Sequence, residues 1–396
     1  MTERGLDVVL FGATGFTGGL VAEYLAGVAA KRPLRWGLAG RNRSKLEAVR
    51  AKLPLPAGSN GAPELIVVDA SDANGLSAMA QRTRVVITTV GPYMHYGEPL
   101  VRACAELGTD YVDLTGEPEF VDLCRERYHA QAERSRAKIV NACGFDSIPH
   151  DLGCYFTLQA LRARMSAAEL ESAAITIEGV VRSNGTFSGG TLQSALEIMS
   201  NAPARARKKR NAPPPIGPRK IAQLPMRPGY RPELGMWLVP MPTIDPEIIV
   251  HSAELLPEYG PDFKYGHYLG VKNALQVAGV IAGVGTIVAL AQIPPAKALL
   301  KKIKDPGEGP SEAKRAKSYF KVGFTADGAG HRVRCEVSGG DPGYTETSKM
   351  LAESALCLAF DRARLPQHYG VVPSAAALGN PLIERLRDAG IVFREL

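Results

Sequence analysis

Residues 6–18 read LDVVLFGATGFTG, and this stretch decides the fold. Its first six residues are rich in strand formers, and a helical stretch follows the loop to about Ala30. The loop between them consists of Gly12, Ala13, Thr14, Gly15, Phe16, Thr17 and Gly18. A strand, a glycine loop and a helix in this order are the context in which a dinucleotide-binding motif works.

The glycine spacing of this loop is G-x-x-G-x-x-G rather than G-x-G-x-x-G. The physical requirements are similar, because glycines allow a tight turn and let the backbone approach a pyrophosphate. The N-terminus of the following helix adds free N–H groups and the positive end of its dipole. The seven loop residues are therefore predicted to bind a dinucleotide, the alternative being a plain tight turn.

The end of the second predicted strand, residues 34–41, indicates which dinucleotide binds. An acid here would accept a hydrogen bond from the 2′-hydroxyl of NAD. The chain instead has Arg41, followed by Arg43 and Lys45, and no acid before Glu47. A cation suits a 2′-phosphate, so the sequence predicts NADP(H). The alternative is that these cations only solvate the start of the next helix.

Further strands alternate with helices along the first 150 residues. This rhythm predicts an α/β fold, a Rossmann-type doubly wound parallel sheet with helices on both faces. Ligands gather at the carboxyl ends of such strands, where Asp69, Gly91 and Pro92 are predicted to contact the cofactor, Asp69 at the adenine. Glu117 and Asp146 occupy similar places. The predicted strands are residues 65–68, 85–90, 111–114 and 138–142.

Composition excludes several classes of protein. Of 396 residues, 45% are hydrophobic and 22% are charged, which is typical of a globular protein rather than a disordered one. The net charge of +7 is mild for a nucleic-acid binder. The six cysteines form no C-x-x-C pair, so neither a zinc cluster nor a thioredoxin-like site is indicated, and no metal site is expected. Because the chain is long and has no secretory start, the cysteines are predicted to be free thiols in a reducing compartment. The short first apolar run fits no signal peptide, which predicts a cytoplasmic protein.

Longer motifs resemble the saccharopine dehydrogenase-like oxidoreductases, and most closely the trans-acting enoyl reductases of mycobacteria. The resemblance covers nearly the whole chain and implies an NADP site, a second α+β domain, and a C-terminal segment that returns to the first domain. The most specific motif is GFDSIPHDLG at residues 144–153. The others are the glycine loop, TVGPY at 89–93, FSGGT at 187–191, DPGY at 341–344 and GVVPSAAALG at 370–379.

For the activity, the resemblance implies reduction of an enoyl thioester for a synthase that lacks its own reductase domain, in the synthesis of polyketide-derived cell-envelope lipids. The substrate is then acyl or lipid-like, and carrier-bound or free. Two rivals stay open: a saccharopine dehydrogenase-type imine reductase or amino-acid dehydrogenase, and a non-enzymatic NADP-binding adaptor at membranes. A homodimer is also implied, and no nucleic-acid partner is expected.

Enoyl reduction needs a hydride at the β-carbon and a proton at the α-carbon, and NADPH supplies only the hydride. Tyr93, at a strand end, and His150, on the 144–153 motif, are the candidate proton donors. The alternatives are that Tyr93 packs beneath the cofactor, and that Asp146 and Ser147 cap the helix beginning near Pro149. The sequence contains no G-x-S-x-G, H-E-x-x-H or P-loop motif, which excludes the best-known hydrolase and phosphotransfer sites.

Three segments are predicted along the chain. Residues 1–150 form the NADP-binding domain, residues 151–345 a substrate and dimerisation domain, and residues 346–396 pack back on the first domain. After residue 150, helices are predicted at 151–164, 189–201 and 347–360, and strands at 174–181, 248–253, 319–326 and 332–338.

Residues 203–242 hold ten prolines and nine basic residues, with Glu233 as the only acid. This composition predicts a long basic loop without regular helix or sheet. The loop is either a solvated linker or a dock for an acidic carrier domain or anionic lipid headgroups. The rest of the chain is nearly neutral.

Residues 273–296 are uncharged and lie between Lys272 and Lys297. Their length suits a membrane span. A span, however, would separate the motifs after residue 297 from the first domain. The other readings are a buried or dimer-contact helix, and a helix that dips into the inner membrane surface.

Overall fold

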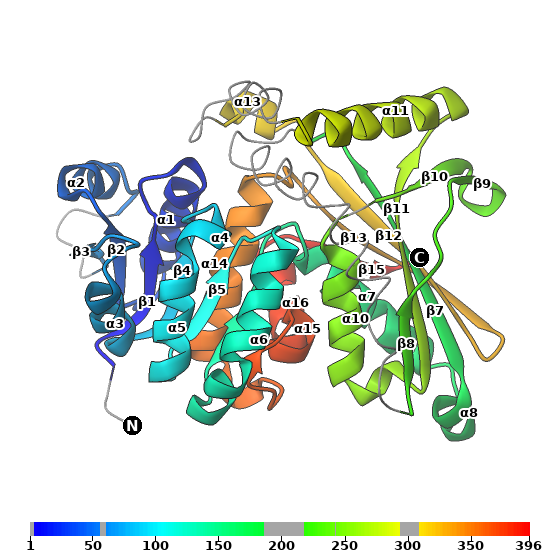
Figure 1. The fold of residues 1–396 in the computed structure, drawn as a ribbon, viewed down its shortest axis with the longest axis horizontal. Coiled ribbons are helices and arrows are strands. Elements are labelled where there is room, and N and C mark those ends of the chain that lie inside the picture. The colour runs from blue at the N-terminus through cyan, green and yellow to red at the C-terminus, as the bar shows by residue number, and fades with distance from the viewer. Residues whose placement is uncertain (1–3, 56–60, 186–217, 242, 294–308) are drawn as a thin grey trace. The chain divides into compact units, whose positions relative to one another are not determined.

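The computed structural model describes residues 4–55, 61–185, 218–241, 243–293 and 309–396 (Figure 1). The chain divides into two compact units. Unit 1 comprises Met1–Ile148 and Asp341–Gly390, and unit 2 comprises Pro149–Gly340 and Ile391–Leu396. The helix predicted at 189–201, the FSGGT motif and the basic cluster at 205–210 lie outside the described residues.

Unit 1 contains a seven-stranded parallel sheet in the order β14-β6-β5-β4-β1-β2-β3. Every residue of β1 is buried, because helices cover both faces of the sheet, as Figure 1 shows. The predicted Rossmann-type α/β fold is confirmed. The strands are β1 Leu6–Phe11, β2 Trp36–Gly40, β3 Glu64–Val67, β4 Thr83–Thr88, β5 Asp110–Asp113, β6 Lys138–Val140 and β14 Gly370–Val371.

The helices of unit 1 begin where the sequence offers caps or prolines. Asn42 and Asp72 accept backbone N–H bonds at the starts of α2 and α3, and Pro99 and Pro118 stand in the first turns of α5 and α6. The helices are α1 Phe16–Ala29, α2 Arg43–Ala51, α3 Ala73–Gln81, α4 Tyr93–Tyr96, α5 Glu98–Leu107, α6 Pro118–Ser135, α14 Thr345–Phe360, α15 Ser374–Ala377 and α16 Gly379–Asp388.

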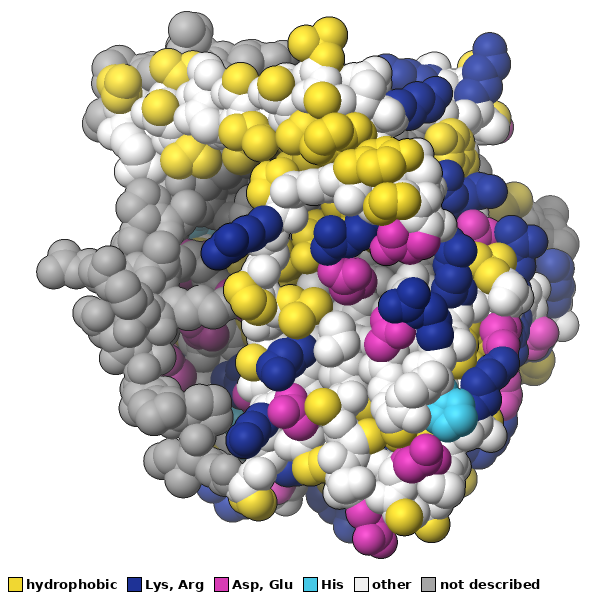
Figure 2. All heavy atoms as spheres, turned by 90° about the vertical axis from the view of Figure 1, so that its right-hand side faces the viewer, with side chains coloured by type: hydrophobic (Ala, Val, Ile, Leu, Met, Phe, Trp, Pro, Cys, Tyr) yellow, Lys and Arg dark blue, Asp and Glu magenta, His cyan; other side chains and the backbone are white. Residues whose placement is uncertain are grey.

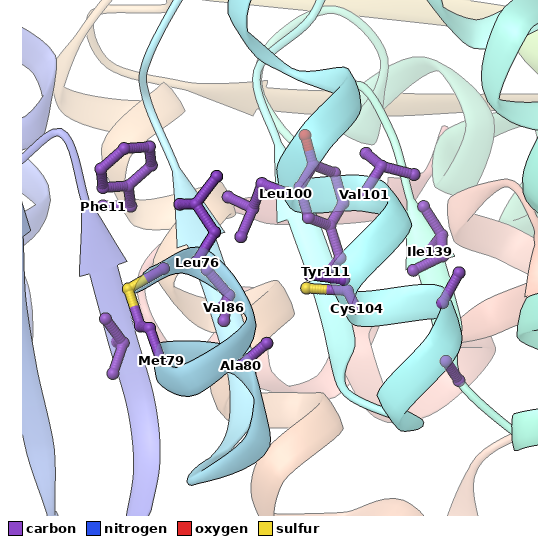
Figure 3. Close-up of a cluster of buried hydrophobic side chains, with 14 of the residues drawn as sticks. Phe11, Leu76, Met79, Ala80, Val86, Leu100, Val101, Cys104, Tyr111 and Ile139 are labelled. Carbon is purple, nitrogen blue, oxygen red and sulfur yellow. The ribbon is translucent and has the colours of Figure 1, made fainter. Parts of the chain in front are cut away.

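One hydrophobic cluster of unit 1 lies between the sheet and the helices α3 and α5 (Figure 3). Leu76 and Met79 of α3 meet Val86 of β4, and Cys104 of α5 lies beside Tyr111 of β5. Val86 and Tyr111 are also register partners, so the same contacts that bury the helices fix the strand alignment. Burial of this kind contributes about 25 cal/mol per Å² of apolar area.

The helix α14 belongs to unit 1 although the whole of unit 2 separates it from the other helices in sequence. Nearly all of its residues are buried, and it packs against α1, α16 and the strands β1, β4 and β5. The C-terminal segment therefore returns to the first unit, as predicted. The exception is the final strand β15, Val392–Glu395, which pairs with β13 in unit 2. The prediction that all of residues 346–396 pack on the first domain is therefore wrong for β15. This strand pairs with β13, and the pairing buries Phe393.

Unit 2 is built on a mixed eight-stranded sheet in the order β15-β13-β12-β7-β11-β10-β9, with β8 paired to β11. Its other strands are β7 Ala174–Ser183, β8 Lys220–Gln223, β9 Gly229–Arg231, β10 Met236–Pro240, β11 Asp262–Val271, β12 Phe320–Gly328 and β13 His331–Gly339. Its helices are α7 Ile148–Arg162, α8 Ala167–Ser172, α10 Asp245–Leu255, α11 Ala274–Ala291 and α13 Glu312–Arg315.

The strand predicted at residues 248–253 is wrong, since these residues lie in the helix α10. The Ile-Ile-Val run at the start of that range suggests a strand, but Pro246 and Glu247 occupy the first turn, as at a helix N-terminus. Within that range the helix buries Ile248, Ile249, His251, Ser252 and Ala253, and not the alternate residues that a half-buried strand would bury.

The prediction that residues 203–242 form no regular structure is wrong for the described part, where β8, β9 and β10 join the sheet. Pro225 and Pro228 lie between strands, and Pro240 ends one, so few ladder hydrogen bonds are lost. The prolines thus separate strands instead of abolishing them.

Candidate functional site

The carboxyl ends of β1 and β4 form the centre of the candidate site in unit 1. These strands are neighbours, yet the chain runs from β1 outward to β2 and β3 before it returns to β4 and the other half of the sheet. Such a reversal point is where dinucleotides bind in doubly wound sheets. The hydroxyl of Thr89 donates to the carbonyl of Gly12 across 3.1 Å and joins the two loops.

The backbone of the glycine loop packs so closely against its neighbours that two of its glycines have no room for a Cβ atom. Gly12 has a φ of +94°, and a Cβ there would lie 2.7 Å from the Thr89 hydroxyl oxygen. A Cβ on Gly18 would lie 2.2 Å from the carbonyl oxygen of Gly12. Among the described residues no side chain caps α1 at Gly15, and an uncapped helix N-terminus is the kind of site that binds an anion.

The C-terminal segment contributes to the same region of unit 1. The ring of Phe16 in the glycine loop packs edge-on against the buried Tyr344, with ring centroids 5.1 Å apart. The backbone N–H of Phe145 donates to the Thr347 hydroxyl across 2.9 Å. The start of the 144–153 motif and the start of α14, far apart in sequence, are thereby connected in unit 1.

Arg41 and Asp69 follow β2 and β3 at the same carboxyl edge, and Arg41 is exposed. Asp69 accepts hydrogen bonds from the backbone N–H and the hydroxyl of Ser71, at 2.9 and 2.7 Å. These bonds, helped by the charge of Arg41, lower the pKa of Asp69. The carboxyl edge of the sheet therefore carries an ionised hydrogen-bond acceptor, Asp69, and an exposed cation, Arg41.

The loop after β4, with Gly91 and Pro92, is held by Glu117, which the sequence placed at the carboxyl edge of the sheet without a specific role. The buried carboxylate of Glu117 accepts the backbone N–H groups of Tyr93 and Met94, at 3.0 and 2.9 Å. An acid at the end of a buried strand was the available signal. Its role as the acceptor for the first N–H groups of α4 follows only from the tertiary structure.

Tyr93 itself is 5% exposed. Its hydroxyl donates to the carbonyl of Thr88 at 3.2 Å and accepts the N–H of Leu114 at 3.1 Å, while burial raises its pKa well above the usual range. The side chain thus ties the ends of β4 and β5 together. This geometry favours the packing alternative over a role as proton donor.

Asp113, at the end of β5, is a further buried acid that the sequence analysis did not single out. Its carboxylate accepts bonds from the N–H groups of Thr115 and Ala142 and from the side chains of Asn141 and Tyr111. Burial raises its pKa to about 6, and these hydrogen bonds oppose the increase. Asp113 therefore fixes the turn that leads into the 144–153 motif.

His150 lies in unit 2, in the first turn of α7, beside two residues that the sequence did not connect to it. Its Nε2 is 3.6 Å from Oδ1 of Asp245, and Nε2 of His267 is 3.6 Å from Oδ2 of the same carboxylate. Burial lowers the pKa of His150 to about 3 and that of His267 to about 4, so both rings are neutral at pH 7. This does not favour His150 as an imidazolium proton donor. Ser147 does not act as a side-chain cap, since its buried hydroxyl has no partner among the described residues.

Comparison with known proteins identifies the family. Residues 8–142 match the family described as Saccharopine dehydrogenase NADP binding domain. The chain is 41% identical over 421 residues to a Mycobacterium tuberculosis protein named as a candidate trans-acting enoyl reductase, across 98% of this chain and 97% of that protein. It is 36% identical over 416 residues to a trans-acting enoyl reductase of Mycobacterium ulcerans, across 98% and 97%. The chain belongs to the saccharopine dehydrogenase-like family of trans-acting enoyl reductases.

A solved structure shows the same fold. The apo saccharopine dehydrogenase (L-Glu forming) from Saccharomyces cerevisiae has a TM-score of 0.52 with this chain, covers 99% of both chains and is 14% identical. At that identity the likeness shows the fold alone. Family membership makes this member an oxidoreductase with NADP(H) as its cofactor.

The glycine contact gives a direct test with a matched control. We expect Gly18→Ala to weaken NADPH binding by about tenfold or more, because the new methyl group must push α1 away from β1. Gly19→Ala places the same methyl group on the same helix, where nothing lies within 4 Å, and should bind NADPH normally. Fluorescence titration of NADPH measures both. Equal affinities in the two variants would show that the close approach does not shape the cofactor site.

Proposed function

We propose that this protein is an NADPH-dependent enoyl reductase that acts in trans on a lipid-like or carrier-bound acyl thioester. The observation that carries the proposal is the 36–41% identity, over nearly the full length of both chains, to proteins named trans-acting enoyl reductases. The geometry of unit 1 supports it, since the predicted cofactor residues converge on one sheet edge.

In this proposal the residues of unit 1 bind and orient the cofactor, which supplies the hydride when bound. The glycine loop would hold the pyrophosphate, and Arg41 would pair with the 2′-phosphate. Asp69 accepts hydrogen bonds near the adenine, and Glu117 holds the loop at Gly91 and Pro92 in place. Preorganisation of this kind leaves the proton and the polarisation of the thioester oxygen as the remaining needs of the reaction.

The role of Arg41 is tested by the ratio of two affinities. Arg41→Asp should weaken NADPH by about 10- to 100-fold, which corresponds to the roughly 1.5–3 kcal/mol of a hydrogen bond to a charged group. NADH, which has no 2′-phosphate, should lose much less. Arg50→Asp, an exposed charge reversal at the other end of α2, serves as control. An equal loss for both cofactors would remove Arg41 from the phosphate site.

The activity is tested by following NADPH oxidation with a panel of 2-enoyl thioesters of increasing chain length, on small thiols and on an acyl carrier protein. We expect turnover to rise with chain length and to be lost in Gly18→Ala. Turnover only with a 2-oxo acid and an amine would support the rival imine reductase. Tight NADPH binding without turnover on any substrate would support the adaptor.

The helix α11 supports a lipid-like setting for this reaction. It contains no charged residue, yet only Val277 and Ala291 are buried, and Leu275 is 83% exposed. By length and composition it is the one helix among the described residues that could cross a membrane. Figure 2 shows hydrophobic side chains gathered at the height of α11, above a face of mixed charges.

We propose that α11 rests on the inner membrane surface rather than spanning the bilayer. The strand before it, β11, and the strand after it, β12, both pair with β7. A single crossing by α11 would place these partners on opposite sides of the membrane. Burial within the chain, one of the alternatives from the sequence, does not fit its exposure, whereas contact with a second copy is an outcome of the test.

Vesicle binding tests this placement. Wild-type protein should sediment with phosphatidylcholine–phosphatidylglycerol vesicles, and Leu275→Glu with Ile281→Glu should weaken this by about tenfold or more, since two apolar side chains no longer enter the lipid. Val392→Glu alters an exposed apolar residue elsewhere and should bind normally. If the glutamates instead convert a dimer into a monomer and leave vesicle binding unchanged, α11 is a dimer contact.

A further inference from the structure

A buried group of three side chains in unit 2 has the composition of a metal site. His150 comes from the first turn of α7, Asp245 opens α10, and His267 lies in the middle of β11. All three are at most 1% exposed. One ligand atom from each lies within 4.8 Å of the other two. We propose that these three residues bind a single divalent cation of the zinc type.

The distances within this His-Asp-His cluster suit coordination better than hydrogen bonding. Each imidazole Nε2 stands 3.6 Å from its own oxygen of the Asp245 carboxylate. That separation is beyond a normal N–H···O bond. Zn–N and Zn–O bonds of 2.0–2.2 Å at a tetrahedral angle put neighbouring ligand atoms roughly 3.3–3.5 Å apart. Binding a cation would require the ligand atoms, which lie within 4.8 Å of one another, to draw together around it.

One polar atom of Asp245 and one of His267 lack the partners that burial demands. Oδ1 of Asp245 and Nε2 of His267 are buried, and neither makes a hydrogen bond with the described residues. A carboxylate removed from water needs a compensating charge as well as hydrogen bonds. A dication would supply that charge, and two imidazoles with one carboxylate are a ligand set that zinc and iron(II) share.

A second residue orients one of the ligands. The hydroxyl of Tyr265 lies 3.0 Å from Nδ1 of His267, and Tyr265 is fully buried in the same strand. With its proton on Nδ1, the ring donates to the Tyr265 oxygen and presents the Nε2 lone pair toward Asp245. Metal-binding histidines are usually held in this way through the second ring nitrogen.

The site would join three elements of unit 2. Because α7, α10 and β11 each contribute one ligand, the cation would connect the two helices to the sheet, and a water molecule would complete a tetrahedral shell. Its binding is independent of the proposed reductase activity, and it can be measured in the absence of any substrate.

The experiment uses the full-length protein freed of metal with a chelator. Wild-type protein should bind about one equivalent of Zn²⁺ in competition with a chromophoric chelator, gain thermal stability with Zn²⁺, and show the visible absorption of tetrahedral Co²⁺ when loaded with cobalt. Asp245→Asn and His267→Gln should each weaken Zn²⁺ binding by about tenfold or more. His251→Gln, which alters another buried histidine of α10, should bind as wild type.

Two results would overturn the proposal. One is wild-type protein that binds no Zn²⁺ and shows no tetrahedral cobalt spectrum, a result that does not depend on whether any variant folds. The other is Zn²⁺ binding that Asp245→Asn and His267→Gln leave unchanged while both variants retain the circular dichroism of the wild type, because the cation would then lie elsewhere.

Discussion

The packing of unit 1 depends on how closely the helix α1 approaches the end of the strand β1. A Cβ on Gly18 would stand 2.2 Å from the Gly12 carbonyl oxygen, so no other residue fits without moving the helix. This contact brings the uncapped N-terminus of α1 to the carboxyl end of the central strand. The loop after β4 meets it through Thr89. The predicted dinucleotide site depends on that separation, because a wider gap would take the helix N–H groups away from the pyrophosphate.

The second half of unit 1 adds a support that is remote in sequence. Tyr24 of α1 donates to Glu353 of α14 at 2.8 Å, and Arg385 of α16 pairs with the same carboxylate at 3.0 Å. Tyr344 packs against Phe16 in the glycine loop. The helix α1 is thus held by the returning C-terminal segment. Residues beyond 340 therefore support the helix that follows the glycine loop.

Features that depend on neighbours in sequence were predictable, and features that depend on distant partners were not. The glycine loop and the cation at Arg41 follow from short-range chemistry at strand ends. The Ile-Ile-Val run in α10 was predicted as a strand because β-branched residues suit strands. The strands β8, β9 and β10 were not predicted, because their proline-rich segment suggested an irregular loop. The local preference for one kind of secondary structure is weak in each case, and packing within unit 2 outweighed it.

The sequence by itself determined the Rossmann-type core of residues 1–148, its NADP(H) cofactor and the uncharged helix α11, since each is written in a contiguous stretch. Only the tertiary structure decided how Tyr93 uses its hydroxyl, and only it brought Asp245 and His267 to His150. His150 stands 95 positions before Asp245, and His267 follows 22 positions after it, so the three show no ligand spacing in the sequence. Burial and proximity, which give such side chains their chemistry, exist only once β11 and α10 have packed.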